Sequence, residues 1–288
     1  MKKLRVLDLF SGIGGFSLGL ERTGGFETVA FCEIEEFPRK VLAKHWPDVP
    51  CYRDVRELTA ERLAADGIAV DIICGGFPCQ DISTAGKGAG LSGERSGLFY
   101  EVARLVGELG PRFVILENVG ALLSRGLDAV LGTLASLGYD AEWHCIPASA
   151  VGAPHRRDRV WIVAYPQGIR RDQGNQNIIR RVGQCAEAFA RFTNRGEIVA
   201  DAIGQRQPGS RTSWNARNPA PIIQRKTIDA FNGRIGGIWS TEPAVGRVAN
   251  GVPDRTHRLK ALGNAVVPQI PELIGNAILD AIGWREAA

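Results

Sequence analysis

A cysteine lies just past an apolar run that ends in two glycines. Residues 68–74 (IAVDIIC) are rich in β-branched side chains and predict a buried strand, which Gly75 and Gly76 end. Cys79 therefore lies beyond the carboxyl end of a strand, where open α/β sheets bind their ligands. Pro78 fixes a backbone dihedral directly before the thiol, so a stiff loop presents Cys79 as a candidate nucleophile. The alternative interpretation is a cysteine that is only a small residue in a turn.

A carboxylate follows the next predicted strand. The apolar residues 113–116 (FVIL) predict a buried strand that ends at Glu117, and an amphipathic helix marked by leucines and valines from Leu98 to Leu109 precedes it. Glu117 should therefore emerge at the same sheet edge as Cys79, one βα unit later. A thiol and a carboxylate on one rim are a candidate nucleophile and acid.

Two arginines alternate directly before a strand predicted over residues 160–164. Arg157 and Arg159 share one face of an extended segment, and there they can clamp a phosphate or orient a carboxylate. The alternative is a capped strand end with solvated arginines.

The N-terminal segment has the pattern of a strand, a glycine turn and a helix. Residues 5–10 predict the strand and residues 11–15 (SGIGG) the turn, which lets backbone N–H groups approach a ligand closely. The turn lacks the dinucleotide fingerprint and the lysine of a phosphate-binding loop. Glu33 ends the next strand (28–32), where an acid suits the hydroxyls of a ribose. Asp54, in a third βα unit, can accept a hydrogen bond from an adenine amino group or be an ordinary surface aspartate.

The remaining segments complete an α/β pattern. Helices are predicted from Glu36 onward, over residues 122–137 and over residues 270–282, the last packing back on the first domain, and a strand is predicted over residues 139–146. Residues 80–97 are polar and glycine-rich, which is typical of a lid or a binding loop.

Composition and charge narrow the class of protein. The 288 residues are 44% hydrophobic and 23% charged, without a membrane-spanning run of about 18 apolar residues or a signal-peptide core, which predicts an intracellular protein. The six cysteines and four histidines form no metal-ligand or disulfide pattern, so no metal is expected.

Residues 166–255 carry 14 Lys and Arg against 7 Asp and Glu. This basic, irregular segment suits a nucleic-acid partner, with a solvated basic surface or disorder as alternatives.

Together these motifs resemble the cytosine-5 DNA methyltransferases. The resemblance covers nearly all of residues 4–165 and 258–280, in order. It rests on FSGIGG (10–15), PCQ (78–80), ENV (117–119), RDR (157–159) and GNAV (263–266). The chain departs from the family at His155, where the family usually has glutamine, and in its short variable segment.

The resemblance implies an α/β, Rossmann-like S-adenosylmethionine-dependent methyltransferase fold with a small, irregular target-recognition domain. The expected units are a catalytic domain over residues 1–165, a target-recognition domain over 166–255, and a C-terminal segment over 256–288 that returns to the catalytic domain. The implied reaction transfers the methyl group of S-adenosylmethionine to carbon 5 of a flipped-out cytosine in a specific double-stranded DNA sequence.

The resemblance also implies roles for individual residues. Cys79 forms a covalent adduct at carbon 6 of the cytosine, and Glu117 bonds N3 and the exocyclic amine. Arg159 holds the base or steers Glu117, and Arg157 is structural or contacts phosphate. The expected cofactor-binding residues are Phe10, Gly12, Ile13, Gly14, Gly15, Glu33, Ile34, Asp54, Val55, Pro78, Asn264 and Val266. The expected DNA-binding residues are Gln80, Ser83, Lys87 and Arg95. We expect a cytoplasmic monomer of a prokaryotic cell or a phage-infected host, with a cognate restriction endonuclease as a candidate partner.

Two rival functions remain open at this point. A tRNA cytosine-5 methyltransferase has the same core, but the Cys-Phe-Thr tripeptide typical of that branch is absent. A non-catalytic DNA-binding module would not need Cys79 and Glu117 on one rim. A nicotinamide oxidoreductase would want the dinucleotide fingerprint, which the chain lacks.

Overall fold

The computed structural model describes residues 2–78, 97–153, 155, 157–168, 178–179, 182 and 255–284. Several expected site residues lie outside the described residues, namely Cys79, Gln80, Ser83, Lys87 and Arg95. Nearly all of the expected target-recognition domain, residues 166–255, lies outside them as well.

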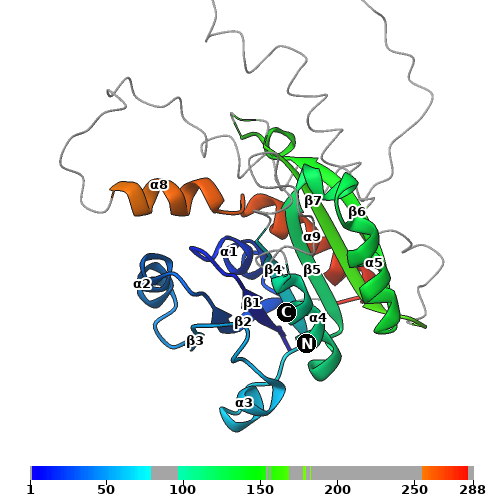
Figure 1. The fold of residues 1–288 in the computed structure, drawn as a ribbon, viewed down its shortest axis with the longest axis horizontal. Helices are drawn as coiled ribbons and strands as arrows, with labels where there is room; N and C mark the ends of the chain where they lie inside the picture. The colour runs from blue at the N-terminus through cyan, green and yellow to red at the C-terminus, as the bar shows by residue number, and fades with distance from the viewer. Residues whose placement is uncertain are drawn as a thin grey trace, which may run out of the picture.

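A seven-stranded sheet organises the described part of the chain (Figure 1). Its strand order is β3-β2-β1-β4-β5-β7-β6. The strands are β1 (Leu4–Leu9), β2 (Phe26–Cys32), β3 (Cys51–Tyr52), β4 (Ile72–Gly76), β5 (Phe113–Val119), β6 (Tyr139–Pro147) and β7 (Asp158–Pro166). The first five pair in parallel, and β7 pairs antiparallel with both β5 and β6. Because the order reverses between β1 and β4, a crevice is expected at their carboxyl ends. The predicted Rossmann-like fold class is confirmed.

Helices cover both faces of this sheet, as Figure 1 shows. The helical elements are α1 (Gly15–Glu21), α2 (Glu36–His45), α3 (Ala60–Ala65), α4 (Leu98–Leu109), η2 (Gly120–Ser124), α5 (Leu127–Ser136), η3 (Ala148–Val151), α8 (Arg255–Asn264) and α9 (Gln269–Ala281). Side chains of β1 alternate between two apolar cores: Leu7 and Leu9 join the core under α4 and α5, whereas Leu4 and Val6 join the core under α1 and α9. Burial on both faces explains why the strands are apolar runs. No helix among the described residues is both long and apolar enough to span a membrane.

Several predicted strands differ from the structure by one or two residues at their ends, and two predicted elements differ by more. The strand expected over residues 68–74 begins only at Ile72, because its pairing with β1 and with β5 starts there; the Asp71 carboxylate before it accepts from Arg5 Nε at 2.8 Å. The helix expected over residues 122–137 is two pieces, η2 and α5. Gly126 separates them with φ of 140°, a value that no α-helix accommodates. The helix predicted over residues 270–282 is confirmed as α9, which packs against α1.

A buried carboxyl group supports the turn between β1 and α1. Asp8 has no solvent exposure, and its Oδ2 accepts a hydrogen bond from the Ser17 hydroxyl in α1 at 2.8 Å. This hydrogen bond connects the end of β1 to α1 across the glycine loop. Burial raises the pKa of Asp8 to about 7.

Close contact between α1 and α9 requires a glycine in α1. A Cβ on Gly19 would overlap the carbonyl oxygen of Pro268 and lie 2.9 Å from Pro271 Cβ. The helices can therefore approach each other only because position 19 has no side chain, and this approach fixes the start of α9 beside the glycine loop.

We predict that Gly19→Ala lowers the free energy of unfolding by about 1–3 kcal/mol, because backbone must shift to admit the methyl group. Gly132→Ala is the matched control: Gly132 is exposed in α5, with nothing within 4 Å of an added Cβ, and should gain up to about 1 kcal/mol. Urea denaturation measures both. Equal effects of the two substitutions would contradict the close packing of α1 and α9.

The buried carboxyl of Asp8 leads to a second prediction, about how the stability of the protein depends on pH. In the unfolded chain the carboxyl ionises near pH 3.8, whereas in the folded protein it keeps its proton to about pH 7. The folded state therefore binds more protons between these values, so its stability falls as pH rises through this window. Asp8→Asn removes this penalty, so its free energy of unfolding relative to wild type should rise by up to about 4 kcal/mol from pH 4 to pH 7.5. A difference that does not change with pH would show that Asp8 does not titrate in this way.

Candidate active site

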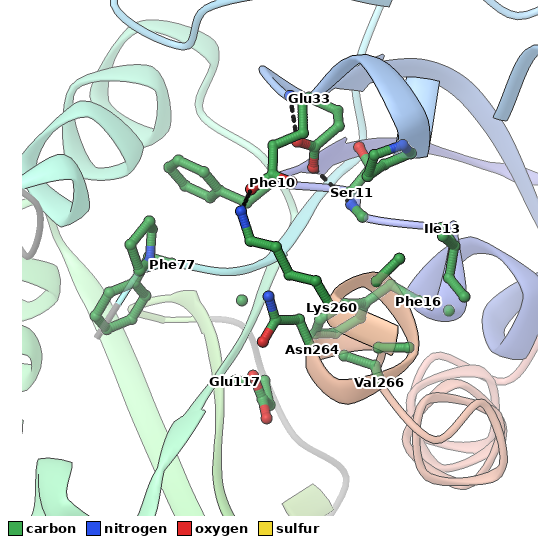
Figure 2. Close-up of a pocket in the computed structure, with 18 of the residues that line it drawn as sticks. Phe10, Ser11, Ile13, Phe16, Glu33, Phe77, Glu117, Lys260, Asn264 and Val266 are labelled. Carbon is green, nitrogen blue, oxygen red and sulfur yellow. Dashed lines mark hydrogen bonds and ion pairs between the residues drawn. The ribbon is translucent and has the colours of Figure 1, made fainter. Parts of the chain in front are cut away.

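A cavity of about 290 Å³ opens at the carboxyl ends of β1, β4 and β5 (Figure 2). It lies where the strand order reverses, as expected for an open α/β sheet. Its walls come from the glycine loop after β1, the end of β2, the ends of β4 and β5, the start of β7, and the region of α8. Six segments of the chain thus meet at one rim of the sheet.

Most of the expected cofactor residues line this cavity. They are Phe10, Gly12, Ile13, Gly15, Glu33, Ile34, Pro78, Asn264 and Val266. Three others lie outside the lining. Gly14 packs on Trp46, Asp54 is bound by its neighbour Arg56 (Nη2 to Oδ2, 2.6 Å), and Val55 is buried in the apolar core.

The glycine loop exposes backbone to the cavity. Phe10 and Gly12 have φ of 51° and 53°, in the left-handed region that only glycine adopts freely. The loop is held to β2, because Ser11 N donates to Cys32 O at 3.2 Å. No atom lies within 4 Å of an added Cβ at Gly12, whereas one at Gly15 would lie 2.7 Å from Val266 O. The loop is therefore open on the side of the cavity and tightly packed on the side of the C-terminal segment.

Glu33 is a carboxylate fixed on the cavity wall. It is 7% exposed, and its two oxygens accept 2.8 Å hydrogen bonds from the backbone N–H groups of Gly12 and Glu35. Burial raises the pKa of Glu33, and these backbone donors oppose the rise. Each carboxylate oxygen keeps a further lone pair, so the group can still accept from a ligand hydroxyl. Next to it, Ile34 keeps 56% of its surface exposed at the edge of the cavity and offers an apolar face.

Glu117 lies at the same rim, on the last residues of β5. Gly76, the end of β4, pairs directly with Glu117, and a Cβ on Gly76 would lie 2.9 Å from Glu117 Oε2. Arg159 Nε forms an ion pair with Glu117 Oε1 at 2.8 Å. Burial raises the pKa of Glu117, while Arg159 and Arg157 oppose the rise.

Arg157 and Arg159 both line the cavity, but not through an extended segment as predicted. β7 begins only at Asp158, and Arg157 has φ of 38°. The carbonyl of Arg157 accepts from Ala148 N at 3.2 Å, which holds this unusual conformation against η3. Burial and the nearby Arg159 lower the pKa of Arg157. His155 is exposed and lies outside the lining.

Asn118 connects the Glu117 strand to the chain that leads to Cys79. It is 2% exposed, its Nδ2 donates to Phe77 O at 3.2 Å, and its Oδ1 accepts from Val119 N at 2.8 Å. The Phe77 ring also packs on Phe99 of α4, with centroids 5.3 Å apart. The backbone two residues before Cys79 is thus anchored from two sides.

The sequence analysis missed several lining residues, of which Lys260 is the most informative. Lys260 lies four residues before Asn264, so the two share one face of α8. That spacing was the available signal. No group of three or more His, Cys, Asp or Glu side chains suited to a metal occurs within the described part of the chain.

Comparison with known proteins agrees with this geometry. Over residues 4–225 the sequence matches the family model described as C-5 cytosine-specific DNA methylase. The chain is 35% identical to Type II methyltransferase M.Sau3AI of Staphylococcus aureus over 216 residues, which are 66% of this chain and 51% of that protein. It is 28% identical to Type II methyltransferase M.DsaV of Dactylococcopsis salina over 234 residues, 80% of this chain and 63% of that protein. The chain therefore spans about half to two thirds of these relatives.

A solved structure supports the fold. The chain superposes on a prophage-encoded protein of E. coli with a TM-score of 0.62 and 21% identity, over 98% of this chain and 100% of that one. At this identity the likeness concerns the fold alone. The family match extends over most of the chain, including the cavity residues on β1, β2, β4, β5 and β7. The chain belongs to the C-5 cytosine-specific DNA methylase family, whose methyl donor is S-adenosylmethionine.

Proposed function

We propose that the protein methylates carbon 5 of a flipped-out cytosine in a specific double-stranded DNA sequence, through a covalent adduct of Cys79 at carbon 6. The observation that carries this proposal is the placement of Glu117. Its side chain is only 13% exposed, its carboxyl is paired with Arg159, and it lies directly opposite the strand end from which the chain runs to Cys79.

The described residues fit S-adenosylmethionine, which supplies an electrophilic methyl group when bound. The open side of Gly12 admits the methionine end, and Glu33 accepts from the ribose hydroxyls. Ile34, a large apolar side chain that is exposed in the cavity, packs on the adenine. Asn264 and Val266 close the cavity from the C-terminal segment. Asp54 and Val55 stay predictions, because both lie outside the cavity lining.

Carbon 5 of cytosine is a poor nucleophile, and the chain's residues activate it. The Cys79 thiolate adds to carbon 6, which makes carbon 5 part of an enamine. Negative charge then develops on the ring, and a hydrogen bond from the Glu117 carboxyl at N3 offsets it. The raised pKa of Glu117 favours the protonated form that can donate this bond. Carbon 5 then takes the methyl group, and the electrons of the broken methyl–sulfonium bond stay on the sulfur. Loss of the carbon 5 proton to water or hydroxide finally breaks the bond between carbon 6 and Cys79 and releases the thiol.

Access to carbons 5 and 6 requires the base to leave the stacked duplex, at a cost of a few kcal/mol. The DNA contacts stay predictions, because Gln80, Ser83, Lys87 and Arg95 lie outside the described residues. The target-recognition domain stays a prediction as well, because nearly all of residues 166–255 lie outside them. The expected cytoplasmic location, monomeric state and partner endonuclease likewise stay predictions.

Replacing the nucleophile tests the proposal directly. We expect Cys79→Ala to reduce methylation at least about a thousandfold and to keep DNA binding, because the adduct is lost while the surface is not. Incubation with radiolabelled S-adenosylmethionine and double-stranded DNA, followed by nucleoside analysis and bisulfite sequencing, measures the reaction and its target. Unchanged methylation would refute the mechanism. Label on tRNA but not on DNA from the wild-type protein would instead favour the RNA-modifying rival.

Glu117→Gln tests the acid. The amide keeps the shape of the side chain and can still donate a hydrogen bond, but it is far too weak an acid to share or transfer a proton at N3, so kcat should fall about 10²–10³-fold. The dissociation constant for S-adenosylmethionine should stay within about threefold, because the expected cofactor contacts lie elsewhere. Isothermal titration and single-turnover kinetics separate the two effects. If kcat and the affinity for S-adenosylmethionine fell by equal factors, Glu117 would support the structure of the cavity and not act on the base.

A further inference from the structure

Helix α8 lies over the cavity and is mostly exposed. Residues 256–264 are exposed apart from the half-buried Ala261. Lys260 Nζ forms an ion pair with Oε1 of Glu35, the residue directly before α2, at 2.6 Å, and His257 stacks on Phe37 of α2, with centroids 6.2 Å apart. In Figure 2, Lys260 reaches from α8 across the cavity toward Phe10 and Glu33. One helix thus touches both the cavity and α2.

The two ends of α8 are held differently. The residues after α8 pack closely against α1. A Cβ added at Gly15 would lie 2.7 Å from Val266 O, and one added at Gly19 would overlap Pro268 O. α9 then buries Ile270, Ile274 and Ile278. The carboxyl end of α8 is therefore fixed by close packing, whereas its first turns rest on α2 through surface contacts.

The ion pair is of a kind that can open and reform. The Lys260 and Glu35 side chains are 53% and 41% exposed, and pairs this exposed contribute little to stability and are screened by salt. Glu35 is nonetheless connected to the cofactor site, because its backbone N–H donates to Glu33 Oε1 and Glu33 Oε2 accepts from Gly12 N. A short chain of hydrogen bonds therefore links Lys260 to the glycine loop.

We propose that Lys260 and Glu35 form a latch that holds α8 across the mouth of the cavity and slows the release of S-adenosylmethionine and of its demethylated product. The proposal rests on the proposed cofactor site. The residues of the pair are positioning residues: they act by placing α8, with Ala261 and Asn264 on its inner face, against the bound ligand. Opening would separate the pair and the His257 contact, the two contacts described here between α8 and the α2 region, while the packing of Val266 and Pro268 stays intact.

The test measures the dissociation rate of radiolabelled S-adenosylmethionine from the full-length protein in a chase with unlabelled ligand. Lys260→Met and Glu35→Gln should each raise this rate about 3–10-fold, and the double variant no further, because both remove one interaction. The charge exchange, Lys260→Glu with Glu35→Lys, should restore a slow rate. Raising KCl from 50 to 500 mM should speed release from wild type but not from either single variant.

Lys40→Met is the matched control. Lys40 forms a 2.7 Å ion pair with Glu36 on the same helix α2, away from the cavity lining, so its loss should leave the rate unchanged. A rate for Lys260→Met equal to that of the control would overturn the latch. Failure of the charge exchange to restore slow release would also overturn it, and would assign Lys260 a direct contact with the ligand. If the wild-type protein bound no S-adenosylmethionine, both the proposed function and the latch would be refuted. If wild type bound the cofactor and methylated DNA, but the Lys260 and Glu35 variants released the cofactor at the wild-type rate, only the latch would be refuted.

Discussion

Backbone pairing between β4 and β5 places Gly76 opposite Glu117, and the candidate chemistry depends on this register. The pairing aligns the ends of two parallel strands, so that the chain toward Cys79 and the Glu117 carboxyl leave the sheet at one point. Space is limiting there, since any side chain at Gly76 would meet Glu117 Oε2. Asn118 then bonds Phe77 O and keeps the two segments together beyond the sheet. A shift of one residue would turn Glu117 to the opposite face.

Three carboxyl groups with little or no solvent exposure lie near this edge, and each is stabilised in a different way. Asp8 accepts a hydrogen bond from the Ser17 hydroxyl, and Glu33 accepts hydrogen bonds from two backbone N–H groups. Glu117 forms an ion pair with the Arg159 guanidinium. Burial raises the pKa of Asp8 to about 7, and the hydrogen bond from Ser17 opposes that rise only in part. Burial raises the pKa of Glu117, and the positive charges of Arg159 and Arg157 oppose that rise. The different partners thus separate a supporting role from a chemical one.

Much of the fold followed from the sequence because the strands are buried on both faces and read as apolar runs. The position of Glu117 followed from topology alone, since the ends of parallel strands meet at one edge. Distant partners could not be predicted in this way: nothing in the local sequence shows that Asp71 binds Arg5, which lies 66 residues away. The left-handed Arg157 was missed because its conformation depends on a bond to Ala148. Lys260 was missed because its partner lies 225 residues away.

The contact between α1 and α9 has a consequence for biosynthesis. α1 is the first helix of the chain and α9 follows residue 268, yet they pack together, and the connection from α8 to α9 forms a wall of the cavity. The parallel strands can assemble while the ribosome is still at work, because β1 to β5 are complete by Val119. The cavity cannot, since Asn264 and Val266 must leave the ribosome first. A chain cut short before residue 264 would thus carry the sheet and Glu117 but a cavity lacking one wall.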